Sequence, residues 1–238
     1  MPASFLTLAK DFCRETGLPV PNALAGSADA GAQQISALLQ RVGEDVWKQT
    51  NWQKCSRRVS WTSVAGADQG DINALCPENM AYIIPRTFWD YTRRVPIHGP
   101  VTPQQWQSQL SLTPLGPLHT FRIANNRLEV APSMSAGRNL VLIYKTYNWL
   151  LSGGVARSAM LLDTDTSYFS DDTMKAGLRM FWLRTKQMPH RLELEEYEDA
   201  KAAEASNATV AAVLSMDSQG GNFAPGIVIP IGSWTITP

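Results

Sequence analysis

Four aspartates, Asp163, Asp165, Asp171 and Asp172, form the densest group of carboxylates outside one charged helical segment. Paired carboxylates can hydrolyse glycosides or hold a metal ion. A calcium loop of the EF-hand type would need further oxygen ligands, a central glycine and a distant glutamate, which this segment lacks. A structural interpretation is simpler: the first two aspartates form side-chain turns, and the last two stabilise the start of a helix.

The sequence carries no local signature of a nucleophilic enzyme, a phosphate-binding loop or a metal site. It contains no G-x-S-x-G motif and no C-x-x-C pair. The cysteines and histidines are scattered: Cys13, Cys55, Cys76, His98, His119 and His190. We therefore expect a protein that is not an enzyme and that has no cofactor and no metal. A catalytic triad assembled from distant residues is the less favoured alternative.

Two arginine doublets, Arg57 with Arg58 and Arg93 with Arg94, are the basic groups best suited to a partner. Their guanidinium groups would pair with DNA phosphates or with an acidic protein surface. The alternative is that they are ordinary surface arginines in hairpins. The whole chain has 21 basic and 21 acidic residues, so it lacks the summed positive field that drives sequence-independent binding to nucleic acid.

The composition of the 238-residue chain is that of a globular protein with few charges. Hydrophobic residues make up 44% and charged residues 18%. Eight tryptophans predict either apolar surface that oligomerisation would cover or an aromatic-rich core. No stretch approaches the roughly 18 apolar residues of a membrane span, and the N-terminus lacks the apolar run of a signal peptide. We expect a soluble protein made in the cytoplasm, without a membrane span.

Apolar spacing predicts helices at both ends of the chain. One covers residues 4–16, and a second runs from an N-cap at Ser27 to near Trp52. Late in the chain, Ser170 or Asp171 begins a third helix, and Pro189 separates it from a fourth that carries many charges.

The middle of the chain is rich in β-branched and aromatic residues, which predicts strands. Residues 119–130 are expected to form a hairpin around two asparagines, because asparagine tolerates left-handed backbone conformations. Residues 139–147 are expected to form a central strand. A short helix over about residues 103–110 begins with a capping box.

The last segment, residues 217–238, differs from the rest because a glycine pair precedes an apolar and proline-rich sequence. We expect an extended arm that docks on a neighbouring subunit, or equally an edge strand packed on its own domain. Its candidate interface residues are Phe223, Ile227, Ile229, Ile231 and Trp234.

These elements predict an α+β fold in which a helical bundle, formed by the N- and C-terminal segments, carries an inserted antiparallel β-rich domain and an extended C-terminal arm. The predicted boundaries place the bundle in residues 1–55 and 151–216, the β-rich domain in 56–150 and the arm in 217–238.

Three blocks of sequence carry a resemblance to a known family. The first has a Gly-x-Pro turn, a Ser-x-Asp entry and a long helix ending in tryptophan, here Gly17, Pro19, Ser27, Asp29 and Trp52. The second spans residues 88–110 and contains Trp89, Asp90, Arg93, Arg94, Gly99, Pro100, Pro103 and Trp106. The third is LVLIYKTYNWL, followed by Asp163-Thr164-Asp165-Thr166 and a helix with Phe181 and Trp182.

In these blocks the chain resembles the head-to-tail adaptor (connector, tubular-tail-protein-A-like) family of short-tailed bacteriophages. The resemblance implies a ring of identical subunits, usually twelve, that lies beneath the portal protein in the virion. The far side of the ring would meet the tail nozzle or tail tube, and genomic DNA would pass through the channel without sequence recognition. Two alternatives stay open: a virion-associated cell-wall hydrolase using the aspartates, and a free-standing DNA-binding protein.

Overall fold

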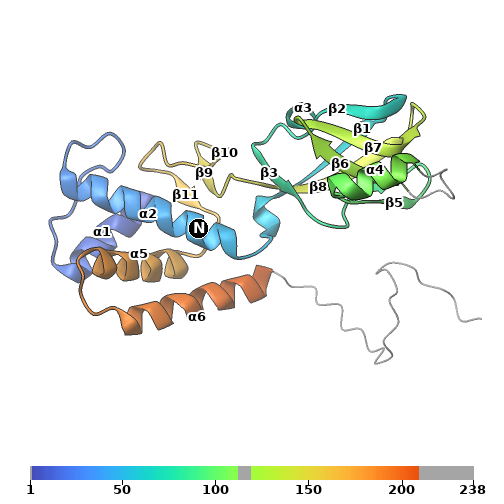
Figure 1. Ribbon diagram of the computed structural model, residues 1–238. Coiled ribbons are helices and arrows are strands. Elements are labelled where there is room, and N and C mark those ends of the chain that lie inside the picture. The colour runs from blue at the N-terminus through green and yellow to red at the C-terminus, as the bar shows by residue number, and fades with distance from the viewer. Residues whose placement is uncertain (1, 112–118, 209–238) are drawn as a thin grey trace, which may run out of the picture.

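The computed structural model describes residues 2–111 and 119–208, and Figure 1 shows their arrangement. Helices from the beginning and the end of the chain form one side of the molecule. A curled β-sheet from the middle of the chain forms the other side. Among the described residues, no helix is long and apolar enough to cross a membrane.

The helical side contains four main helices and one short 3-10 turn: α1 (Phe5–Thr16), α2 (Ala30–Gln49), η1 (Gln53–Cys55), α5 (Asp171–Thr185) and α6 (Arg191–Ala208). The four helices were predicted, and the structure confirms them. Helix α5 contacts α1, α2 and α6. The side chain of Asp29 accepts a hydrogen bond from the amide of Ala32 and caps α2, so the predicted N-cap at Ser27 is wrong by two residues.

The curled sheet has eight strands in the order β1-β8-β4-β5-β6-β7-β2, and β3 also pairs with β8. The strands are β1 (Ser56–Thr62), β2 (Gly66–Asp71), β3 (Met80–Ile83), β4 (Trp89–Asp90), β5 (Val95–His98), β6 (His119–Ala124), β7 (Arg127–Met134) and β8 (Asn139–Thr146). Strands β5 and β6 are parallel, and all other pairs are antiparallel.

Local sequence signals in this region are confirmed. Strands β6 and β7 form the predicted hairpin, in which Asn125 and Asn126 have positive φ angles of 49° and 64°. Strand β8 is hydrogen-bonded along both edges, as expected of a central strand. Two short helices connect strands, α3 (Ile72–Leu75) and α4 (Pro103–Ser111). The capping box of α4 is formed by Thr102 and Gln105.

A second, smaller sheet lies with the helices. Its strands are β9 (Leu150–Ser152), β10 (Val155–Arg157) and β11 (Thr166–Ser167), in the order β10-β9-β11. The apolar residues of the helices, together with Trp149 and Phe169, form one core. The inner face of the curled sheet forms another, which contains Phe88, Phe121 and Leu142.

The predicted fold class, a helical bundle with an inserted antiparallel β-rich domain, is wrong. The described chain is a mixed α/β protein whose largest element is the eight-stranded curled sheet, accompanied by six α-helices. The sheet contains a parallel pair, and strands β9 to β11 stand in a region that was assigned to helices. Strands β9 to β11 are only two or three residues long, so local periodicity does not reveal them. The predicted C-terminal arm lies outside the described residues, and the predicted domain boundaries stay a prediction.

Candidate functional site

The aspartates of the predicted carboxylate cluster hold main-chain segments in place. Asp163 Oδ1 accepts hydrogen bonds from the amides of Leu24 and Ala25, both at 2.8 Å. Asp165 is fully buried, and its Oδ2 accepts from the amides of residues 161 and 162, while its Oδ1 has no partner. Each carboxylate is thus used as a loop anchor, which is the structural role predicted from the sequence.

The second pair of aspartates lies at the start of α5. Both oxygens of Asp171 lie 3.0 Å from the amide of Ala3, so this side chain holds the N-terminal segment. Asp172 is exposed in the first turn of the helix, where a negative charge is favourable. Within residues 2–111 and 119–208, no group of three or more histidine, cysteine, aspartate or glutamate residues could hold a metal ion.

The curled sheet contains a buried polar chain that the sequence did not suggest. Arg138 Nη1 lies 3.4 Å from Asp90 Oδ2 and donates to His119 Nε2 at 3.0 Å. The Nδ1 of His119 lies 3.0 Å from the carbonyl oxygen of Pro132, an arrangement that suits a neutral imidazole donating from Nδ1. Burial lowers the pKa of His119, and the charges of Arg138 and Arg93 lower it further. All three side chains are buried, so this series of hydrogen-bonded groups has a structural role.

The cysteines are buried free thiols. Burial raises the pKa of Cys55 to about 11 and that of Cys76 to about 12, and it also raises the pKa of Cys13. A thiol must ionise to act as a nucleophile, so these three remain protonated and unreactive near neutral pH.

The tryptophans fill the interior. Trp52, Trp106 and Trp149 are 3% exposed or less, and the other described tryptophans are partly buried. The abundance of tryptophan therefore reflects core packing in the described chain, and it does not mark an apolar surface. The most exposed large apolar side chain is Leu192, at 76%.

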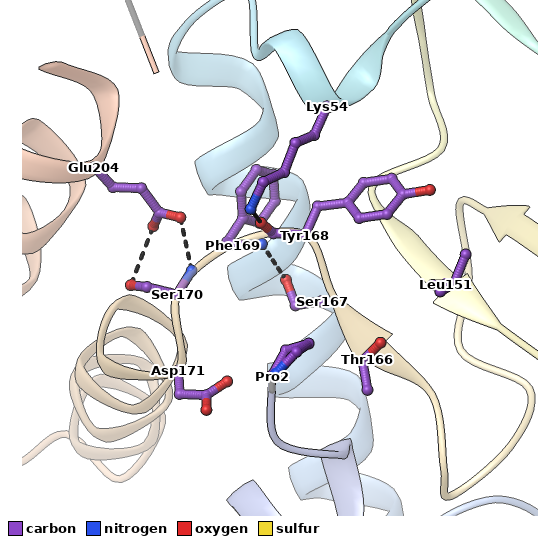
Figure 2. A pocket seen from close by; sticks show the side chains of 10 residues that line it. All are labelled: Pro2, Lys54, Leu151, Thr166, Ser167, Tyr168, Phe169, Ser170, Asp171 and Glu204. Atoms are coloured by element: carbon purple, nitrogen blue, oxygen red, sulfur yellow. Dashed lines mark hydrogen bonds between the residues drawn. The ribbon is translucent and has the colours of Figure 1, made fainter. Parts of the chain in front are cut away.

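A groove of about 440 Å³ opens where the helical side meets the small sheet (Figure 2). It is lined by Pro2, Lys54, Leu151, Thr166, Ser167, Tyr168, Phe169, Ser170, Asp171 and Glu204. A neighbouring cavity of about 400 Å³ shares five of these residues and extends to Asn207 and Ala208 at the end of α6. Sequence reasoning missed this groove because segments far apart in the chain build it.

The charged side chains of the groove already have partners within the chain. Figure 2 shows both carboxylate oxygens of Glu204 directed at Ser170, with distances of 2.6 Å to the amide and 3.3 Å to the hydroxyl. Lys54 Nζ donates to the carbonyl oxygen of Tyr168 at 2.9 Å. Pro2 and the half-exposed Leu151 add apolar surface. The groove therefore presents apolar surface without a charged group free to select a small polar ligand.

The structure separates the first arginine doublet. Successive residues of a strand point to opposite faces, so Arg57 and Arg58 of β1 cannot act together. Arg57 forms a 2.6 Å ion pair with Glu78, whereas Arg58 is exposed with its guanidinium 5.4 Å from the ring centroid of Tyr91.

The second doublet lies in the turn between β4 and β5, where Arg93 and Arg94 are both exposed. Asp90 accepts a hydrogen bond from the amide of Arg93, which fixes the turn. Three of the four predicted basic residues are thus available to a partner. The predicted interface residues of the arm, Phe223, Ile227, Ile229, Ile231 and Trp234, lie outside the described residues.

No protein-family model matches the sequence, and a search of curated proteins found no match. The functional conclusion therefore depends on the sequence blocks and on the geometry described above.

Proposed function

We propose that this chain is a structural subunit of the head-to-tail adaptor of a short-tailed bacteriophage. In this proposal, copies of the chain form a closed ring on the portal. The ring joins the portal protein to the tail nozzle or tail tube around the DNA exit channel. Portal binding would favour the ring by mass action, because only the assembled state binds. Two observations support the proposal: the resemblance of the three sequence blocks to that family, and the groove between the helical side and the small sheet.

The observation that carries the proposal is the groove of Figure 2. Its charged groups are paired within the chain, and its continuation reaches Ala208, where the described chain ends. The sequence that follows contains the apolar residues of the predicted arm. In the proposed ring, the arm of a neighbouring copy covers this groove, and apolar burial stabilises the contact.

The same geometry argues against a catalytic role for the aspartates. Asp163 and Asp171 accept hydrogen bonds from main-chain amides of another segment, and Asp165 accepts them from residues 161 and 162 of its own loop. A glycosidase needs one carboxyl group that can donate a proton and a second that faces the substrate or a water. No observation on the described residues favours the hydrolase alternative.

The proposal is tested by measuring the mass of the purified full chain, first alone and then with a purified portal ring. The portal ring comes from the short-tailed phage that encodes this chain. At low protein concentration and physiological ionic strength we expect monomers alone, and a complex of portal with a ring of this chain after mixing. Leu151→Asp in the groove should abolish ring formation, whereas Val64→Asp, at an exposed site in the curled sheet, should not. A chain that ignores the portal at every concentration and converts a cell-wall substrate would overturn the proposal.

A further inference from the structure

Charge is distributed unevenly along a chain that is neutral as a whole. Residues 56–146, which form the curled sheet, contain nine basic and five acidic residues, an excess of four positive charges. Helix α6 contains two basic and six acidic residues, an excess of four negative charges. The sheet and α6 occupy different regions of the molecule (Figure 1).

Four arginines account for the positive excess of the sheet. The acids of this region pair with other arginines, in Asp68–Arg127, Glu78–Arg57, Asp90–Arg138 and Glu129–Arg122. Asp71 caps α3, and Lys145 is buried against main-chain carbonyl groups. The remaining arginines are exposed and have no carboxylate partner among the described residues: Arg58, Arg86, Arg93 and Arg94.

These four arginines lie on β1 or in the segments next to β3 and β4, the strands that flank β8. Arg58 lies on β1 opposite Ile143 of β8, on the face away from the buried Leu142. Strands β3 and β4 pair with the other edge of β8. Arg86 lies between those two strands, and the second doublet follows β4. We call this surface, defined by the four arginines, the arginine face.

Helix α6 presents the complementary charge on its outer side. Glu195, Glu198 and Asp199 are exposed, and spacings of three and four residues place them on one side of the helix. Glu195 also pairs with Arg191 and Glu198 with Lys201, but α6 as a whole keeps its excess of four negative charges. The opposite side is held to α2, because Tyr197 and Lys201 both contact Asp45, at 2.9 and 3.1 Å. We call the three exposed acids the acidic face. Figure 1 shows α6 at the outside of the helical layer.

We propose that the arginine face of one copy binds the acidic face of α6 on a second copy. This inference rests on the proposed ring and names the contact that orders it. A two-fold contact centred on either face alone would bring like charges together, whereas a head-to-tail contact pairs unlike charges and repeats around a closed ring. A second copy is favoured over DNA because the acidic helix of each chain would repel phosphates.

Charge reversal tests the contact with the full chain at high protein concentration and low ionic strength. One variant carries R58E and R93E, and the other carries E195K and D199K. Sedimentation velocity should show salt-sensitive oligomers for the unmodified chain and at least a tenfold weaker association for each variant alone. Mixing the two variants should restore association, because every interface of an alternating oligomer then pairs unlike charges. The control R157E, on β10, should associate like the unmodified chain.

Two results would overturn the inference. The first concerns association itself. Either both reversal variants associate as strongly as the unmodified chain, or the unmodified chain shows no salt-sensitive association. The other is a reversal variant that associates normally but no longer retains duplex DNA, which would assign the arginines to phosphate binding. Either result leaves the adaptor proposal intact, since the mass measured with the portal ring tests that proposal separately. Unchanged circular dichroism of each variant shows that it is folded.

Discussion

The helical side and the curled sheet fill their interiors in different ways. In the helical side, close approach of a large ring to a helix backbone requires a glycine. A Cβ atom at Gly43 would lie 2.1 Å from the ring of Trp149. In the sheet, a buried polar chain links Asp90, Arg138 and His119. Both regions have an apolar core, but the helical side also depends on volume at Gly43 and the sheet on a buried charged network, so different substitutions should disrupt each.

The largest effect is expected when the buried polar chain of the sheet is broken. Arg138→Met leaves Asp90 as a buried carboxylate without its cation, and this should lower the free energy of unfolding by about 3–5 kcal/mol. The matched control is Arg127→Met, which removes an exposed ion pair with Asp68 and should change the free energy of unfolding far less, because solvent screens this pair. Urea denaturation of both variants measures the difference. Equal losses would show that the polar chain contributes no more than a surface pair.

The second-largest effect is expected in the helical side, when a methyl group is added at Gly43. Gly43→Ala would ordinarily stabilise a helix, but here the new methyl group collides with Trp149 and should cost about 2–3 kcal/mol. The loss should be smaller when Trp149→Leu is already present, because the space for the methyl group then exists. A double-mutant cycle followed by thermal denaturation measures this coupling. Additive losses would place the strain elsewhere.

The third prediction concerns Lys145, which joins the two regions. Its ammonium is buried and donates to the carbonyl oxygens of Trp47 and Thr50 at the end of α2, at 2.6 and 2.7 Å. Burial lowers the pKa of Lys145 to about 8. Lys145→Met should cost about 1–3 kcal/mol, because both carbonyl groups lose a charged donor. The exposed Lys48→Met is the control and should change the free energy of unfolding little. If neither Lys145→Met nor Lys48→Met changes the free energy of unfolding, water must replace the ammonium of Lys145 as the donor.

Sequence reasoning located the elements that local chemistry determines. Ser4 and Gly17 cap α1, and the paired asparagines turn the β6–β7 hairpin, because these signals act within a few residues. The extent of the sheet was missed. Strand β2 has the sequence GADQGD, and β4 is two residues long, so only their partners make them strands.

The candidate site shows the same division between local and long-range information. The anchoring role of Asp163 follows from a residue type that favours turns. The separation of Arg57 from Arg58 follows from the alternation of a strand. Arg86 stands alone in the sequence and joins the arginine face only through the pairing of β3 and β4 with β8. Short motifs therefore predict the roles of single residues, whereas the residues that share a surface can be identified only from the fold.

The smallest predicted effect is a dependence of sheet stability on pH. The pKa of His119 is lowered in the folded chain, so below its ordinary value of 6.5 the unfolded chain binds a proton that the folded chain does not. This contribution to the free energy of unfolding is complete above pH 6.5. It is lost progressively as the pH falls below 6.5 towards the lowered pKa, by at most about 1.4 kcal/mol per pH unit.

Urea denaturation between neutral pH and mildly acidic pH measures this slope. His119→Gln removes the titrating group and should flatten the curve below pH 6.5, although it lowers stability throughout. His98→Gln is the matched control, because His98 is exposed and should leave the curve unchanged. Equal slopes for the unmodified chain and His119→Gln would show that the imidazole is not held neutral. The buried chain of the sheet would then tolerate a second positive charge beside Arg138, and the contrast between a volume-dependent and a charge-dependent interior would fail.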